Sequence, residues 1–356
     1  MISQKEIDRQ MLELDREIIL MLGESAVRKI SINVWLCKKD DGIEEACMNN
    51  NVVGINYMIE QHGYRIESIL NFGAEYGRLD IVKLAIEVYN INIRREDNYA
   101  LCIAVENNHL EVIEYLIEKG ADIHSNDNHI LRHAAKAGYL DIVKFAIGKG
   151  GISQADIDRA LCTAIQYNHI AIVEYLVETA SANIHANNES PLIIAAQYRQ
   201  FDMVEYFVKK SANINSSALE AAITTGRLDI VKLLVKNYSA DIHDDNEILR
   251  IAIKYEYMKI LGYLLELGFE IYLALHISAE YGKLDIIKLL VENYGADIHD
   301  DSIICYAIEG GYMSILEYLV ENGVHVRNNK GALRYAIECK HLDIVKYLLE
   351  NGAQYN

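Results

Sequence analysis

The sequence lacks the features that mark a nucleic-acid-binding protein or a membrane protein. It has 34 basic against 52 acidic residues, a net charge of −18, and no run of lysine or arginine. This charge disfavours nucleic acid and anionic membrane surfaces as partners. No apolar stretch is long enough to span a bilayer, and residues 1–17 are too rich in charge to begin a signal peptide. We therefore expect a soluble, intracellular, cytoplasmic protein.

Signatures of catalysis and of metal binding are missing as well. The chain contains no GxGxxG, GxxxxGK[ST], HExxH or CxxC motif. Its six cysteines are scattered, which fits small buried thiols in a reducing compartment better than a disulfide framework. The best set of metal-ligand candidates is His124, Asp127, His129 and His133, of which the last two would share one face of a helix. We favour surface or capping roles for them, and we predict no metal, no cofactor and no enzyme activity.

The sequence does contain a motif of about thirty residues that repeats along nearly its whole length. Residues 100–127 read ALCIAVENNHLEVIEYLIEKGADIHSND, and residues 218–245 read ALEAAITTGRLDIVKLLVKNYSADIHDD. Ten clear copies each start from an apolar residue: Leu70, Leu101, Leu131, Leu161, Leu192, Leu219, Leu249, Leu275, Ile304 and Leu333. A decayed copy starts at Ile43. Self-similarity of this period predicts a solenoid, so we expect residues 43–356 to form one array.

Each copy predicts two short helices separated by a sharp break. Apolar residues recur at helical spacing on both sides of the break, but helices of roughly eight to ten residues are unstable alone, so neighbouring pairs must stack. The break falls on residues that tolerate the left-handed conformation: Gly77, Asn108, Gly138, Asn168, Gly226, Gly282 and Gly311. Arg199, Glu256 and Lys340 occupy the same repeat position, and we expect each to be strained by roughly 1 kcal/mol.

Two further repeat positions support this prediction. An acidic residue opens the second helix, where it complements the positive end of the helix dipole: Asp80, Glu111, Asp141, Asp202, Asp229, Asp285 and Asp343. Alanine recurs in the first helix, as expected where stacked helices approach closely: Ala104, Ala134, Ala164, Ala195, Ala222, Ala252, Ala307 and Ala336. The sequence therefore predicts an all-α solenoid of stacked helix-turn-helix units.

This pattern resembles the ankyrin repeat, whose unit carries a TPLHxAA opening, a GHLEVVKLLL second helix and a closing GADVN. The matching residues include Pro191-Leu192, Leu275-His276, Asn108-His109-Leu110 and Gly120-Ala121-Asp122-Ile123. Pro191 is the only proline, so the Thr-Pro step of the family is almost absent. The stretch before each new opening is also about three residues short, as between Ile123 and Leu131, so we expect the family's β-hairpin fingers to be stubs.

In residue composition and closing motif, the repeats resemble the ankyrin arrays of amoeba-infecting giant DNA viruses. The sequence is rich in Ile, Asn and Tyr, and ADIH replaces ADVN. For a viral protein, the expected compartment becomes the host cytoplasm. His124, His185, His243 and His299 replace the family's Asn after the second helix. A pH sensor is one interpretation of this recurrence, and we favour side chains that satisfy local backbone groups.

Residues 1–42 differ from the array and form a separate segment. Ser3-Gln4-Lys5-Glu6 is a capping-box pattern, and Ile7, Met11, Leu14, Ile18 and Met21 follow at helical spacing. We expect a helix that caps the open core of the first repeat. The alternative is a docking helix or a small adaptor module such as an F-box, although the Leu-Pro start of an F-box is not visible.

The resemblance implies that partners bind the finger tips and the exposed end of each first helix, on the concave side of the solenoid. The end of the first helix is the pair of residues before the break, for example Gln166-Tyr167 and Gln197-Tyr198. We call these pairs, taken over all repeats, the rim. The predicted binding residues on the rim are Tyr76, Glu106, Asn107, Tyr167, Tyr198, Tyr255, Tyr281, Glu280, Glu309 and Glu338.

Tyrosine gives a large contact area at low entropic cost, so five tyrosines at one repeat position favour an interface. The alternative is a composition effect, because the chain has 24 Tyr against 5 Phe. Tyrosines within the second helix are instead interpreted as packing residues: Tyr115, Tyr175, Tyr206, Tyr263, Tyr318 and Tyr347. We predict a monomeric, non-enzymatic protein–protein interaction scaffold whose partner carries basic residues. The alternative is a substrate adaptor that recruits a target to a ubiquitin ligase or another effector through residues 1–42.

Overall fold

The computed structural model describes residues 42–62, 66–94, 98–237, 242, 246–327 and 331–354. Across these residues the chain forms helices and turns, with no β-strand, so the prediction of an all-α solenoid with stub fingers is confirmed. The predicted cap at residues 1–22, and residues 24–41, lie outside the described residues. The contacts divide the chain into two units, one up to Ala182 and one from Asn183.

The described residues of the first unit form five helix pairs. In order, they are α3 Gly42–Met48 with α4 Val52–His62, α5 Glu67–Glu75 with α6 Leu79–Lys83, α7 Tyr99–Glu106 with α8 Leu110–Glu118, α9 Ser125–Ala137 with α10 Leu140–Lys149, and α11 Gln154–Gln166 with α12 Ile170–Glu178. A π-helical turn, Leu84–Val88, extends α6. The pair α3 and α4 corresponds to the decayed copy that starts at Ile43.

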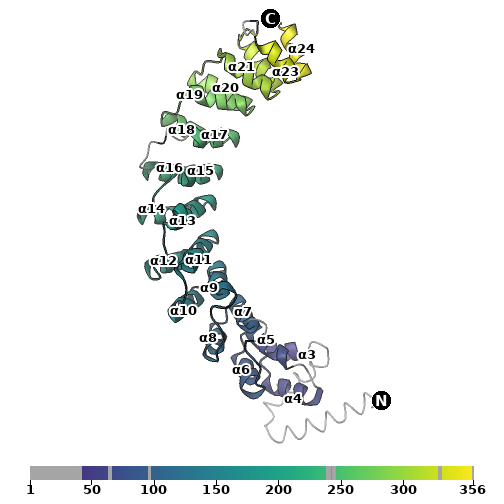
Figure 1. Ribbon diagram of the computed structural model, residues 1–356, viewed down its shortest axis with the longest axis vertical. Helices are drawn as coiled ribbons and strands as arrows, with labels where there is room; N and C mark the ends of the chain where they lie inside the picture. Colours follow the sequence, from purple (N-terminus) through teal and green to yellow (C-terminus); the bar gives the residue numbers. More distant parts are fainter. Residues whose placement is uncertain are drawn as a thin grey trace, which may run out of the picture. The chain divides into compact units, whose positions relative to one another are not determined.

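In the second unit, the part of the chain that the structure describes forms six helix pairs. They are α13 Ala186–Gln197 with α14 Phe201–Lys209, α15 Ser216–Thr224 with α16 Leu228–Asn237, α17 Asn246–Lys254 with α18 Met258–Glu266, α19 Ile271–Glu280 with α20 Leu284–Tyr294, α21 Asp301–Glu309 with α22 Met313–Glu321, and α23 Ala332–Glu338 with α24 Leu342–Glu350. Within this unit, α13, α15 and α17 lie along one side of the stack and α14, α16 and α18 along the other (Figure 1).

The core of each unit lies between the helices of a pair and between successive pairs. The alanines of the predicted column are fully buried, and Gly73 and Ser278 complete that column. A methyl group added at Gly73 would lie 3.0 Å from the Val82 side chain, which shows how closely the helices approach. The buried Ser278 hydroxyl donates a 2.6 Å hydrogen bond to the Ala274 carbonyl, so it leaves no unsatisfied polar group.

The break between the two helices has the predicted left-handed conformation in all ten clear repeats. The glycines and asparagines of that column have positive φ angles, and so do Arg199, Glu256 and Lys340, at 63°, 58° and 65°. The prediction of backbone strain at these three residues is confirmed in its geometry, because a side chain with a Cβ crowds the following carbonyl in this conformation.

The connections between pairs are held by side-chain acceptors instead of strands. Asn98 and Glu189 occupy the same repeat position, both are left-handed and both are 7% exposed. The Asn98 Oδ1 atom accepts a hydrogen bond from the Asp122 amide, and Glu189 Oε2 accepts one from the Asn213 amide, at 3.1 and 3.2 Å. Each residue therefore fixes the next connection, 24 positions along the chain.

At two of the recurring histidines, His185 and His299, the ring contacts a carboxylate, and not the local backbone groups that we predicted. The backbone amides of His124, His185 and His299 instead donate to the carboxylate or amide oxygen two residues earlier, on Asp122, Asn183 and Asp297. This is an Asx turn, so the residue before Ile carries the backbone contact. The rings of His185 and His299 lie against Glu189 and Asp297. His243 lies outside the described residues.

Candidate functional site

The rim lies where the first helix of each repeat ends. Five first helices end on a glutamate: Glu75, Glu106, Glu280, Glu309 and Glu338. The residue that follows caps the helix, and it is a tyrosine in α5, α11, α13 and α19. Each pair therefore lies immediately before the left-handed turn, as the repeat pattern predicted.

Only three of the five predicted tyrosines are well exposed. Tyr167, Tyr198 and Tyr255 expose 43%, 47% and 49% of their surface. Tyr76 and Tyr281 are half-buried, in contrast to our expectation of one exposed column. The difference arises from neighbouring repeats: the Tyr76 hydroxyl donates to Glu44 Oε1 at 2.7 Å, and Tyr281 is hydrogen-bonded to Arg250. The bond to Glu44, together with burial, raises the pKa of Tyr76 to about 12.

Two of the exposed tyrosines have the ammonium group of a lysine from the same chain over their rings. The Lys136 ammonium lies 5.5 Å from the centre of the Tyr167 ring, and the Lys254 ammonium lies 5.6 Å from that of Tyr255. Both distances are within the range of a cation–π contact. The rings of Tyr167 and Tyr255 therefore lie where they can attract a positively charged group.

The acidic residues of the rim are exposed, but they differ in how far they are neutralised. Glu280 accepts two hydrogen bonds from Arg250 Nη1, at 2.9 and 3.1 Å, so its charge is paired. Glu338 lies 3.5 Å from Arg334, and Glu106 lies 4.0 Å from His129 Nε2. Glu309 accepts a hydrogen bond from the Tyr335 hydroxyl, a group that carries no positive charge. Asn107, also exposed, donates to its own helix at Ile103.

A row of donor side chains that the sequence reasoning missed holds the backbone of the rim. In several repeats of each unit, the residue after the left-handed turn reaches back to the preceding repeat of that unit, and we call this contact the inter-repeat latch. His109 Nε2 lies 2.9 Å from the Glu75 carbonyl, His169 Nε2 lies 2.9 Å from the Lys136 carbonyl, and the Tyr257 hydroxyl donates to the Thr224 carbonyl at 2.9 Å. Tyr139, Tyr312 and His341 make longer contacts of the same kind.

The latch follows the identity of the turn residue one repeat earlier. Where that residue is glycine, as at Gly77, Gly138 and Gly311, a histidine ring lies against the space that a Cβ would fill. Where it has a side chain, the latch position is often a flexible residue. After Arg199, Arg227 Nη1 donates to the Arg199 carbonyl, and after Glu256, Lys283 forms an ion pair with the Glu256 carboxylate. This pairing between neighbouring repeats is a signal that the sequence did contain.

Two of the predicted metal-ligand candidates, His129 and His133, lie next to each other on α9. The rings of His129 and His133 stack with their centres 5.5 Å apart on α9, and burial lowers the pKa of both imidazoles. In the described part of the chain, no three His, Cys, Asp or Glu side chains are grouped as metal ligands would be. The same residues include no helix that is both long and apolar enough to cross a bilayer. The five described cysteines are not joined in disulfides.

Comparison with known proteins agrees with this architecture. A family profile described as Ankyrin repeats (3 copies) matches residues 43–127, 131–218 and 275–356. The chain belongs to the ankyrin-repeat family, and its array is a protein–protein interaction domain. This family and fold are typically non-enzymatic, and nothing indicates catalysis.

Similar proteins include viral ankyrin arrays, which confirms the predicted resemblance. Ankyrin repeat protein R791 of Acanthamoeba polyphaga mimivirus is 38% identical over 73 residues, covering 20% of this chain and 25% of that protein. Protein L715 of the same virus is 48% identical over 44 residues, 12% of this chain and 14% of its own length. Alpha-latrocrustotoxin-Lt1a of Latrodectus tredecimguttatus is 33% identical over 91 residues, 23% of this chain and 6% of the toxin.

The matched stretches are short parts of these relatives, a quarter of their length or less. Among solved structures, the human ASB11 ankyrin repeat domain is similar at 24% identity and a TM-score of 0.40, covering 47% of this chain and 84% of that domain.

Proposed function

We propose that the rim binds a partner protein that presents basic residues, and that the protein acts as a non-enzymatic scaffold. The observation that carries this proposal is the placement of glutamate at the C-terminal end of five first helices. The helix dipole makes that end negative, so an acidic side chain there is unfavourable by roughly 0.3–1 kcal/mol. The helix dipole does not explain these glutamates, and among them Glu338 is paired with Arg334 on its own helix, whereas a cationic partner would account for the recurrence.

The exposed tyrosines support the proposal that the rim is the binding surface. Tyr167, Tyr198 and Tyr255 lie at the rim without being needed for the core, since nearly half of each side chain faces solvent. The tyrosines of the second helices differ, because Tyr115, Tyr175 and Tyr263 are half-buried. Large amphipathic rings at a surface with a regular repeat are suited to act as binding anchors.

The test uses a partner captured with the full chain and then purified. The double variant Tyr198→Ala with Tyr255→Ala removes two exposed rings from one unit and should weaken binding by about 30-fold or more. Tyr263→Ala, in the second helix of the same unit, is the matched control: it should lower the melting temperature by removing packing and leave the affinity of the folded protein unchanged. Loss of stability in the double variant, with binding intact, would contradict the proposal.

A second test separates paired from unpaired acidic residues. Glu309→Gln should weaken binding, and the loss should shrink as salt is raised, because an unpaired surface charge is screened. Glu280→Gln should have a smaller effect, since Arg250 already neutralises that carboxylate. Equal losses at the two positions, with no dependence on salt, would argue against an electrostatic role for the rim.

The adaptor alternative is tested by the segment that precedes the array. Affinity capture with residues 1–356 and with residues 43–356 should recover the same rim partner if the array alone binds it. If the shorter chain loses ubiquitin-ligase components and keeps the target, the adaptor function replaces the scaffold function. Fractionation of expressing cells would check the proposed cytoplasmic location.

A further inference from the structure

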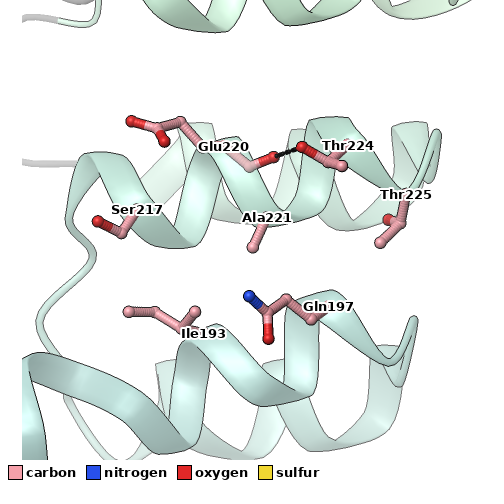
Figure 2. Close-up of a pocket in the computed structure, with 7 residues that line it drawn as sticks. All are labelled: Ile193, Gln197, Ser217, Glu220, Ala221, Thr224 and Thr225. Atoms are coloured by element: carbon pink, nitrogen blue, oxygen red, sulfur yellow. Dashed lines mark hydrogen bonds between the residues drawn. The ribbon is translucent and has the colours of Figure 1, made fainter. Parts of the chain in front are cut away.

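A notch interrupts the exposed side of the first helices in the second unit. It has a volume of about 330 Å³ and lies between α13 and α15, beside the rim residues Gln197 and Thr224. Ile193 and Gln197 form one wall, and Ala221 faces them from the other (Figure 2). The notch therefore belongs to the surface proposed above to bind a partner.

The notch exists because one repeat has small residues at three positions of its lining, of which Ala221 is buried, Thr225 is half-buried and Thr224 is exposed. Ala221 occupies a position where each of the other nine clear repeats has a larger side chain: Phe72, Ile103, His133, Thr163, Ile194, Ile251, Ile277, Tyr306 and Tyr335. Thr224 replaces the Glu, Gln or Lys found at that position in the other repeats. Thr225 lies where five of the repeats have tyrosine, including the two neighbours with Tyr198 and Tyr255.

The residues that line the notch can accommodate an uncharged side chain together with the peptide backbone that carries it. The hydroxyls of Thr224 and Thr225 donate to the Glu220 and Ala222 carbonyls at 2.7 Å, so their hydrogens are already used. The Gln197 amide extends toward the gap in Figure 2 and makes no hydrogen bond among the described residues. A primary amide both donates and accepts, which is what the N–H and C=O groups of an extended peptide require.

The lining of the notch contains a negative charge and no positive one. Glu220 is the one charged residue in its lining, and Figure 2 shows its carboxylate on the side of α15 away from Gln197. Ile193 and Ala221 therefore give the notch an apolar part, Gln197, Ser217, Thr224 and Thr225 give it an uncharged polar part, and the edge at Glu220 is negative. In an extended peptide, side chains two positions apart lie on the same face, about 7 Å from each other. One side chain can fill the apolar space while the second faces the negative edge.

We infer that the notch receives a large aliphatic side chain from an extended segment of the partner, with a basic residue two positions away facing Glu220 and the Gln197 amide on the segment's backbone. This inference rests on the proposed function, because it specifies which chemistry the rim recognises. It also assigns one place on the rim, between α13 and α15, as the point where a single side chain of the partner is recognised.

The test uses the full chain with isotope-labelled Ile, Ala and Thr methyl groups and three capped peptides. The probe is acetyl-Gly-Leu-Gly-Lys-Gly-amide. The two comparison peptides replace Leu with Asp, or Lys with Glu. The Leu–Lys peptide should shift the methyl signals of Ile193, Ala221 and Thr225 in NMR spectra. The Asp peptide should bind at least tenfold more weakly, and the Glu peptide several-fold more weakly.

Ala221→Ile fills the notch with the side chain that Ile251 and Ile277 supply at the same position of two following repeats, so it should fold normally. It should abolish the peptide-induced shift at Ile193. Thr163→Ile places isoleucine at the same repeat position in α11, in the first unit, and should leave peptide binding unchanged. Glu220→Gln should reduce the difference between the Lys and Glu peptides.

Three outcomes would overturn the inference: equal binding of the three peptides, no shift at the notch methyls, or full binding by Ala221→Ile. Shifts that grow with protein concentration and without peptide would assign the notch to a second copy of the chain instead. The proposed function is tested separately. If the Tyr198 and Tyr255 double variant loses the partner but the notch binds none of the peptides, the rim function stands and this inference fails.

Discussion

The inter-repeat latch predicts that two glycines with nearly the same backbone conformation will respond differently to one added methyl group. Gly77 has a φ angle of 65° and Gly295 one of 67°. A Cβ atom at Gly77 would lie 2.7 Å from the Cγ and Cε1 atoms of the His109 ring, whereas at Gly295 it would meet nothing within 4 Å. Gly295→Ala is therefore a matched control that contains the backbone strain alone.

The expected magnitudes follow from this geometry. A left-handed alanine is disfavoured by roughly 1 kcal/mol, and the loss of glycine's freedom in the unfolded chain offsets about half of that. At Gly77 the displaced ring also loses its 2.9 Å hydrogen bond to the Glu75 carbonyl, a contribution of about 1 kcal/mol. We expect Gly77→Ala to destabilise its repeat by about 1.5 kcal/mol, against about 0.5 kcal/mol for Gly295→Ala.

Hydrogen exchange is the suitable assay, because it reports local opening in an array whose repeats need not unfold together. The extra 1 kcal/mol corresponds to about fivefold faster exchange in peptides from α5 to α8, relative to the effect of Gly295→Ala around α20. In a His109→Ala background, Gly77→Ala should cost about as little as Gly295→Ala, because the ring is gone. Equal effects at the two glycines, or a full effect without His109, would refute the latch.

Three further predictions follow from single features. Lys340→Gly, at a left-handed position with an exposed side chain, should raise the urea midpoint of unfolding slightly, by relief of strain of roughly 0.5 kcal/mol; a lower midpoint would count against strain. Burial raises the pKa of Asp300, but hydrogen bonds from Tyr272, Ser302 and His276 outweigh it and hold that pKa below its usual range. Its stabilisation should be fully present above the unfolded pKa of about 3.9 and be lost progressively as pH falls from there through the lower pKa of the folded state, so Asp300→Asn should lower the melting temperature at pH 6 and lower it less at pH 2; a constant difference would contradict this. Deleting residues 1–22 should cause aggregation or faster exchange at Ile43–His62 if that segment caps the array, whereas an unchanged monomer would indicate a docking element.

Much of this architecture was predictable because it is local and repeated. Helix breaks, burial of the alanine column and left-handed residues depend on a few adjacent positions, and ten copies reinforce one another. Even the strained residues Arg199, Glu256 and Lys340 were identified, since the column fixes their conformation whatever their own preference. The position of the rim at the ends of the first helices was predictable for the same reason.

The sequence alone therefore determined the family, the helix pairs and the position of the rim. Only the tertiary structure decided which rim residues are available, because that depends on side chains about thirty residues away. Glu44 draws Tyr76 into a hydrogen bond, and Arg250 pairs with Glu280, whereas Tyr198 stays exposed. The notch likewise required the structure, since its volume depends on how Ala221 faces Ile193 across two repeats. The repeat period determines the backbone conformation, whereas contacts between neighbouring repeats of different sequence determine which side chains of the rim stay exposed.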